Sequence, residues 1–153
     1  MAGAVTKRVV FIGSDHGGFA LKQALVEHIS KKGDVDVRDL GTNSDESVHY
    51  PRYGKEVGES VLKSADSLGI VVCGTGIGIS IAANKVKGVR CALCHDITTS
   101  RLCRQHNNAN VLAMGGRVIG VEVAKDMVDA FLSTPFEGGR HAHRIGLIAD
   151  MEE

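Results

Sequence analysis

Short apolar segments alternate with longer amphipathic segments along most of the chain. Five segments are short and rich in apolar or β-branched residues, as is typical of strands in a sheet. They cover residues 8–13, 35–40, 68–72, 89–94 and 110–114. Apolar residues at helical spacing predict helices over 19–32, 53–64, 96–106 and 121–132, a helix from the glycine-rich stretch to residue 87, and a last helix from about residue 138.

This order of elements predicts an α/β protein. Strands that alternate with helices through short links form a parallel sheet that is covered by helices on both faces. The expected architecture is a three-layer α/β/α, Rossmann-like fold with a five-stranded parallel sheet. Residues 68–72 are apolar throughout, which indicates an interior strand, whereas residues 35–40 alternate and are expected at a sheet edge. The 153 residues, 43% of them hydrophobic, are expected to form a single domain over 1–153.

The charge balance argues against two classes of partner. Lys and Arg together number 18, as do Asp and Glu, so the chain lacks the basic excess of nucleic-acid and membrane-surface binders. Residues 1–8 contain no signal-peptide hydrophobic region, and the apolar run 9–12 is too short to span a bilayer. We therefore predict a cytoplasmic protein with no nucleic-acid or membrane partner and with reduced cysteines.

Cys91 and Cys94 have the C-x-x-C spacing of redox and zinc sites. Both lie in a predicted strand, where residues three apart point to opposite faces. The pair is therefore expected to form neither a disulfide nor a metal site. No other metal-ligand cluster stands out in the sequence.

The carboxyl ends of the predicted strands are where ligands bind in folds of this kind. Three of these ends combine glycine with polar or charged residues, namely 14–18, 73–80 and 115–117. A fourth, at His95 and Asp96, is polar without glycine. We expect the functional site at this edge of the sheet.

The stretch 73–80, Cys-Gly-Thr-Gly-Ile-Gly-Ile-Ser, gives the strongest chemical signal. Alternate glycines let backbone N–H groups close around an anion, and the helix that starts there adds its positive dipole end. A dinucleotide loop would need glycine at position 79, which is Ile79, and would follow the first strand instead of the third. A nucleotide-binding module without catalysis and glycines that serve only close packing stay open as alternatives.

Cys73 stands at the mouth of this loop, beside the start of a helix. Such a position suits a reactive thiol, although most cysteines are simply small buried side chains. Cys73 is a candidate nucleophile in a thiol hydrolase with His106, or a general base that moves a proton on carbon.

Several cations favour a phosphorylated substrate. Arg140 and Arg144 are four residues apart, so on a helix they share one face and suit a phosphate. Arg117 and His16 follow two strand ends, and His106 is flanked by amides that suit sugar hydroxyls. An anion cradle, a thiol base, a histidine and these cations together predict aldose–ketose isomerisation through an enediolate.

The chain resembles the B-type ribose-5-phosphate isomerases, a family that includes allose-6-phosphate and galactose-6-phosphate isomerases. The resemblance runs nearly end to end. It is carried by residues 13–19, 50–51, 73–85, 104–107, 116–118 and 137–141. It implies interconversion of ribose 5-phosphate and ribulose 5-phosphate in the non-oxidative pentose phosphate pathway, with no metal or organic cofactor. A six-carbon sugar phosphate stays open as the substrate.

The resemblance also implies the catalytic residues. Cys73 would carry a proton between C2 and C1, and Thr75 and His106 would assist opening of the furanose ring. Ile79 stands where one branch of the family has a glutamate base, so the chain resembles the cysteine branch. The substrate-binding residues would be Asp15, His16, Tyr50, Gly74, Gly76, Ile77, Gly78, Ser80, Asn107, Arg117, Arg140 and Arg144.

Members of this family work as a homodimer or a dimer of dimers, with active sites shared across the interface. The segment His106–Asn107 and Arg117 would come from the neighbouring chain. Asp15 and Asn107 would hold hydroxyls, and Tyr50 would lie against the sugar. The phosphate would be bound by His16, Arg117, Arg140 and Arg144.

Overall fold

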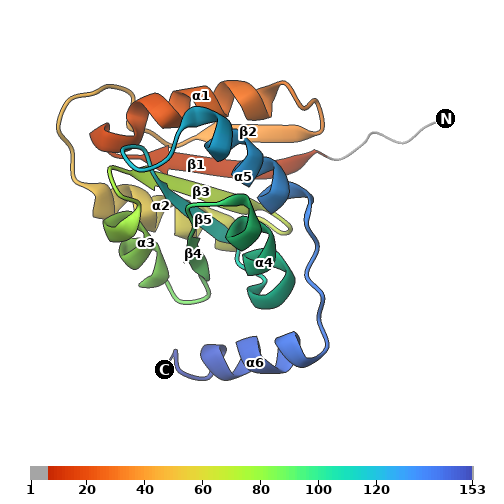
Figure 1. Ribbon diagram of the computed structural model, residues 1–153. Helices are drawn as coiled ribbons and strands as arrows, with labels where there is room; N and C mark the ends of the chain where they lie inside the picture. Colours follow the sequence, from red (N-terminus) through yellow and green to blue (C-terminus); the bar gives the residue numbers. More distant parts are fainter. Residues whose placement is uncertain (1–6, 153) are drawn as a thin grey trace.

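One parallel sheet forms the centre of the computed structural model, which describes residues 7–152 (Figure 1). Its strands are β1 (Arg8–Ser14), β2 (Val35–Asp39), β3 (Leu68–Cys73), β4 (Cys91–Leu93) and β5 (Val111–Gly115). Their order across the sheet is β2-β1-β3-β5-β4, and every neighbouring pair is parallel. This confirms the five-stranded parallel sheet, with the alternating strand β2 at an edge. The expected absence of a signal peptide falls on residues 1–6 and lies outside the described residues.

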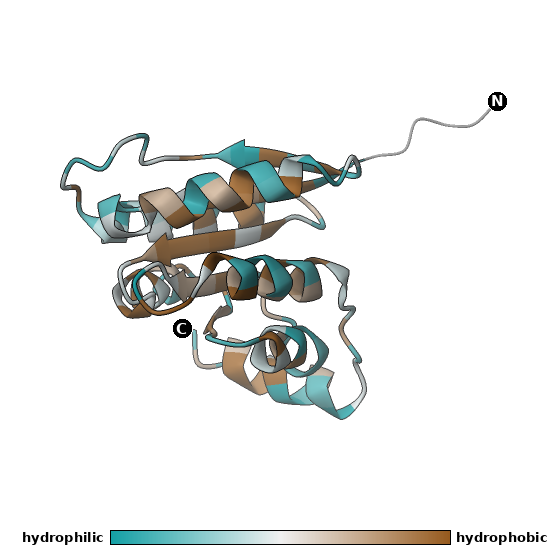
Figure 2. Ribbon diagram, turned by 45° about the horizontal axis from the view of Figure 1, so that its top comes forward, coloured by the Kyte–Doolittle hydropathy of each residue, from teal (hydrophilic) through white to brown (hydrophobic). Residues whose placement is uncertain are grey.

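Helices cover both faces of the sheet (Figures 1 and 2). They are α1 (Phe19–Ser30), α2 (Tyr50–Lys63), α3 (Ile77–Asn84), α4 (Ile97–Asn107), α5 (Val121–Ser133) and α6 (Arg140–Ala149), with a short 3₁₀ helix η1 (His16–Gly18). Apolar side chains of α1, α4 and α5 share one core with the sheet, and those of α2 and α3 share the other. The three-layer α/β/α prediction is confirmed. Helix α6 follows an extended segment and lies apart from the sheet, below α4 in Figure 1.

Strand β3 explains how one segment supplies both cores. All of its residues are buried, and successive side chains point to opposite faces. Ile70 and Val72 join the core under α1 and α5, whereas Val71 and Cys73 join the core under α2 and α3. This is the burial expected of an interior parallel strand.

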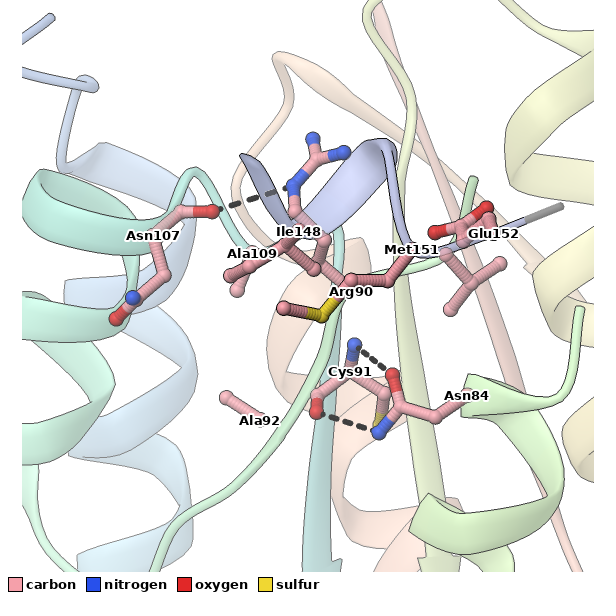
Figure 3. A pocket seen from close by; sticks show the side chains of 10 residues that line it. Asn84, Arg90, Cys91, Ala92, Asn107, Ala109, Ile148, Met151 and Glu152 are labelled. Atoms are coloured by element: carbon pink, nitrogen blue, oxygen red, sulfur yellow. Dashed lines mark hydrogen bonds between the residues drawn. The ribbon is translucent and has the colours of Figure 1, made fainter. Parts of the chain in front are cut away.

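Several predicted boundaries are wrong by a few residues. Helix α2 begins at Tyr50 instead of residue 53, because Pro51 suits a first helical turn. Helix α3 ends at Asn84, before the predicted residue 87. Strand β4 is shorter than predicted, and the Asn84 side chain bonds both the N–H (2.8 Å) and the carbonyl (2.9 Å) of its first residue, Cys91 (Figure 3).

The C-x-x-C pair points to opposite faces of the sheet, as predicted. Cys94 is buried in the core beneath α1 and α5, and Cys91 packs against the core beneath α2 and α3. Burial raises the pKa of the Cys91 thiol to about 12. All four cysteines are free thiols. Within residues 7–152, every helix is too short or too polar to cross a bilayer.

Successive strands are added to the sheet on opposite sides of β1. From β1 the chain passes outward to β2, and β3 then returns to the other side of β1. The gap between the carboxyl ends of β1 and β3 is therefore the switch point where ligands bind in open α/β sheets. The register aligns Ser14 with Val72, so Asp15 and Cys73 emerge side by side.

Candidate active site

A cavity of about 490 Å³ opens at this switch point. Its lining comes from the loops after β1, β3 and β5 and from the starts of α2 and α3. The lining residues are Asp15, Tyr50, Cys73, Gly74, Thr75, Ile77, Gly78, Ile81 and Arg117. Every one except Ile81 is a predicted site residue. We refer to this space as the thiol cavity.

Cys73 is the last residue of β3, with only 5% of its surface exposed. Its Sγ accepts a hydrogen bond from the Gly76 N–H at 3.1 Å. The turn that makes this possible requires glycine, because Gly76 has φ +80° and a Cβ there would lie 2.7 Å from the Met114 backbone. The backbone thus fixes the sulfur at the opening of the cavity.

The start of α3 lines the thiol cavity at the place where the glycines predict an anion cradle. The first N–H groups of a helix have no partner inside it, and they carry the positive end of the dipole. Thr75 Oγ1 accepts the Ile77 N–H at 3.2 Å, and Gly78 follows it in the cavity wall. Cys73 and these groups therefore face the same space.

Two predicted cradle residues, Gly76 and Ser80, do not line the thiol cavity. The Gly76 N–H donates to the Cys73 sulfur, and Ser80 lies deeper in helix α3. The Ser80 N–H donates to the Gly76 carbonyl (3.1 Å), and its hydroxyl donates to the Ile77 carbonyl (2.6 Å). Because Ser80 lies one turn inside α3, both donors are used by the helix itself. The prediction of Ser80 as a substrate donor is therefore corrected.

Tyr50 forms one wall of the cavity by lying directly on the glycine loop. A Cβ at Gly78 would lie only 2.5 Å from the Tyr50 ring. The missing side chain at Gly78 is thus what lets the ring approach. Tyr50 keeps 39% of its surface exposed, so the ring can contact a ligand.

The loop after β1 brings a carboxylate and an imidazole. Asp15 is 7% exposed, and its Oδ1 accepts the Gly18 N–H at 3.2 Å. His16 does not line the thiol cavity; its Nδ1 accepts the Val48 N–H at 3.1 Å. In a neutral ring the proton is then on Nε2, which can donate to an anion.

Arg117 lies on the thiol cavity of its own chain. Its N–H donates to the Gly74 carbonyl at 2.9 Å, and its guanidinium packs where a Gly74 side chain would be. The expectation that a neighbouring chain supplies Arg117 is therefore wrong. The physical reason is that β3 and β5 are adjacent, so their carboxyl ends meet.

The other predicted residues lie in a second region, at α4 and α6. His106, Asn107, Arg140 and Arg144 do not line the thiol cavity. His106 instead stacks on His141, with ring centroids 4.5 Å apart and planes at 13°. Its Nε2 lies 3.9 Å from Glu137 Oε1. Sequence reasoning gave no role to Glu137 and His141, although both stand in the block that carries the resemblance.

The ligand-type atoms of His106, Glu137 and His141 all lie within 4.8 Å of one another. The sequence did not single out this group. Lone pairs of imidazole lie in the ring plane, so two stacked, nearly parallel rings direct them side by side and not toward one point. The arrangement therefore does not match the converging ligands of a tetrahedral zinc site.

Asn107 lines a different cavity of about 420 Å³, between the start of β4 and α6 (Figure 3). Its carbonyl accepts a hydrogen bond from Arg90 Nε at 3.2 Å. Ile148 and Met151 form much of the apolar side of this cavity. Asn107 is thus placed with the outer edge of the sheet and not with Cys73.

Comparisons with known proteins show to which family the chain is similar. A family model described as Ribose/Galactose Isomerase matches residues 10–148. Ribose-5-phosphate isomerase B of Escherichia coli is 47% identical over 147 residues, covering 96% of this chain and 97% of the relative. The structure of Clostridium thermocellum ribose-5-phosphate isomerase B superimposes with a TM-score of 0.92 at 49% identity, covering 94% and 97% of the two chains.

A third similar protein was solved with a ligand. Ribose-5-phosphate isomerase B of Mycoplasma genitalium, with bound ribulose-5-phosphate, has a TM-score of 0.91 and 43% identity. The alignment covers 96% of this chain and 97% of that one. With a matching family model over most of its length and relatives this similar, the chain belongs to the ribose/galactose isomerase family.

Proposed function

We propose that the protein is an aldose–ketose isomerase that interconverts D-ribose 5-phosphate and D-ribulose 5-phosphate. The observation that carries the proposal is the position of the Cys73 sulfur, which faces the same cavity as the start of α3. A base beside N–H donors is what proton transfer next to a carbonyl requires. Family membership favours this function over a nucleotide-binding module or a thiol hydrolase.

The proposed isomerisation moves one proton between neighbouring carbons. The Cys73 thiolate takes the proton from C2 of the open-chain aldose, and the C–H electron pair forms the C1–C2 double bond. The carbonyl electron pair moves to O1, giving an enediolate that free backbone N–H groups of the glycine loop, Gly78 among them, would stabilise. The thiol then returns the proton to C1 while a proton moves from O2 to O1, which leaves the ketone at C2.

The remaining predicted residues would bind and open the sugar. Asp15 would accept hydrogen bonds from substrate hydroxyls, and Tyr50 would cover the sugar. Thr75, with His106 of a neighbouring chain, would move the protons of ring opening. Arg117 and His16 would bind the phosphate, assisted by Arg140 and Arg144 of the same neighbouring chain.

We propose a homodimer, or a dimer of dimers, in which each cavity is completed by the second region of another copy. Two observations support this: the second region does not line its own thiol cavity, and several apolar side chains on α3 and α6 are uncovered. These are Ile77, Ile81, Leu147 and Ile148, each between 44% and 56% exposed. The chain would act as one isomerase domain, in the cytoplasm, without a cofactor.

An assay with ribose 5-phosphate in D₂O tests this function. We expect ribulose 5-phosphate to form with solvent deuterium incorporated at the carbon that receives the proton. Allose 6-phosphate, measured in parallel, is expected to react much more slowly. No turnover of ribose 5-phosphate, or calorimetric binding of ATP or NAD but not of the sugar phosphate, would overturn the proposal.

A further inference from the structure

His106 is held on two sides by residues that have no role in the scheme above. His141 covers one face of its ring at a centroid distance of 4.5 Å, and the Glu137 carboxylate lies 3.9 Å from Nε2. His106 also stands in the last turn of α4, whereas Glu137 precedes α6 and His141 lies in its first turn. The neighbours of this ring therefore come from a separate part of the chain.

The backbone locks the two elements together at this place. The Glu137 N–H donates to the Gln105 carbonyl at 3.1 Å, directly beside His106. The His141 N–H donates to the Gly138 carbonyl, also at 3.1 Å, which fixes the start of α6. The segment between Glu137 and His141 is thus attached to the end of α4 through the Glu137 N–H.

His141 has the properties of a packing surface for its neighbour. Its side chain is buried, at 6% exposure, and its Nε2 has no hydrogen-bond partner among residues 7–152. Desolvation lowers its pKa, and the positive charges of Arg140 and His106 lower it further, against an opposing effect of Glu137. His141 thus presents a buried flat ring against which His106 stacks.

We propose that Glu137 and His141 are positioning residues for ring opening: together they hold the His106 imidazole in the orientation that opens the furanose. This inference rests on the proposed function, because it assigns His106 to the ring-opening step. In that step the C1–O4 bond breaks, its electron pair stays on O4, and O4 takes a proton. The O1 hydroxyl loses its proton as the C1 carbonyl forms. Because His106 must reach atoms in another subunit's cavity, small errors in ring direction would be costly.

Ribulose 5-phosphate separates ring opening from proton transfer at carbon. Its 5-hydroxyl is esterified, so the C2 ketone has no hydroxyl with which to form a five-membered ring, and the sugar stays open. Loss of its C1 proton in D₂O, followed by NMR, therefore requires the Cys73 chemistry but no ring opening. Turnover of ribose 5-phosphate requires both.

The test uses Glu137→Gln, His141→Ala and His141→Phe in the full chain, with the exposed Glu122→Gln as a matched control. We expect Glu137→Gln and His141→Ala to lower kcat for ribose 5-phosphate by roughly 10-fold to 100-fold, below the roughly 10²–10⁴-fold cost of losing a general acid. C1 proton loss should change less than about twofold, since that chemistry needs no positioned His106. His141→Phe keeps a stacking ring and should retain most of kcat.

Two outcomes would overturn the inference. One is an equal fall of both rates in Glu137→Gln and His141→Ala, which would show a structural role or a role in proton transfer at carbon. The other is an unchanged kcat for ribose 5-phosphate in both variants. Failure of the proposed function is distinguishable from either, because the unsubstituted protein would then remove no C1 proton from ribulose 5-phosphate.

Discussion

The thiol cavity and the stacked histidines at α4 and α6 differ in what holds them in place. The cavity is built from the carboxyl ends of β1, β3 and β5, which are hydrogen-bonded to one another in the centre of the sheet. The histidine region depends on the end of one helix and the start of another that lies apart from the sheet. One region is fixed by strand pairing and the other by a few local contacts.

This difference separates the chemistry into two parts. In the proposed mechanism the sheet positions the base, Cys73, and the anion cradle, which must be closely aligned with each other. The peripheral helices carry the groups assigned to ring opening and to part of the phosphate. Under the proposed dimer, the sheet of one copy would hold the proton-transfer groups and the second region of a neighbouring copy would provide the rest.

The largest effect is expected at the thiol cavity, from the substitution Cys73→Ala. Removal of a general base is expected to lower kcat for ribose 5-phosphate by about 10²–10⁴-fold, with a small change in KM, because binding groups remain. Cys91→Ala is the matched control, since that thiol lies outside the cavity, and it should keep the original kcat. A kcat of Cys73→Ala within about tenfold of the control would remove Cys73 as the base.

Mixing two inactive variants tests whether the regions act across subunits. Cys73→Ala and His106→Ala, unfolded together and refolded at equal concentration, should regain about one quarter of the original activity. Half of the randomly paired dimers are mixed, and each mixed dimer has one site with both groups intact. Activity no higher than that of the separate variants would show that both groups act within one chain.

A smaller effect is expected where Tyr50 meets the glycine loop. Gly78→Ala would place a methyl group in the volume of the Tyr50 ring and should raise KM by roughly tenfold by displacing that wall of the site. Alanine otherwise suits a helix, so the cost should come from Tyr50 alone. In a Tyr50→Ala background, the same substitution should change KM less than about threefold; additive effects would contradict this explanation.

The smallest expected effect is on protein stability, and it comes from His141 in the second region, at α4 and α6. The pKa of His141 is lowered in the folded protein, so below about pH 6.5 the unfolded chain binds a proton that the folded chain does not. The free energy of unfolding should therefore fall as pH drops below about 6.5, which Tm measured across this pH range would show. His141→Phe should lose this part of the pH dependence. Asp96 and Asp129 also have lowered pKa values, but they act only at more acidic pH.

The sequence predicted the thiol cavity well, because the patterns that place its residues are visible within short stretches of the chain. Apolar runs fix which segments become parallel strands, and parallel strands bring their carboxyl ends to one edge. Asp15, Cys73 and Arg117 could therefore be placed together without knowledge of their contacts. The error at Arg117 came from the resemblance, whereas strand adjacency alone would have kept it in its own chain.

The second region, at α4 and α6, could not be predicted in the same way. The segment from 134 to 139 has no helical or strand period, so nothing in it indicates that Glu137 returns to the end of α4. Ser80 was misassigned because sequence position alone does not show which N–H groups a helix uses internally. Both cases depend on hydrogen bonds between particular groups.

The Asn84 side chain has a consequence for how copies of this protein can meet. By bonding both the N–H and the carbonyl of Cys91, it satisfies the open edge of β4 much as one residue of an additional strand would. Exposed strand edges are templates for pairing between molecules and for aggregation. At this residue, a single amide therefore occupies both backbone groups through which a further strand could pair with β4.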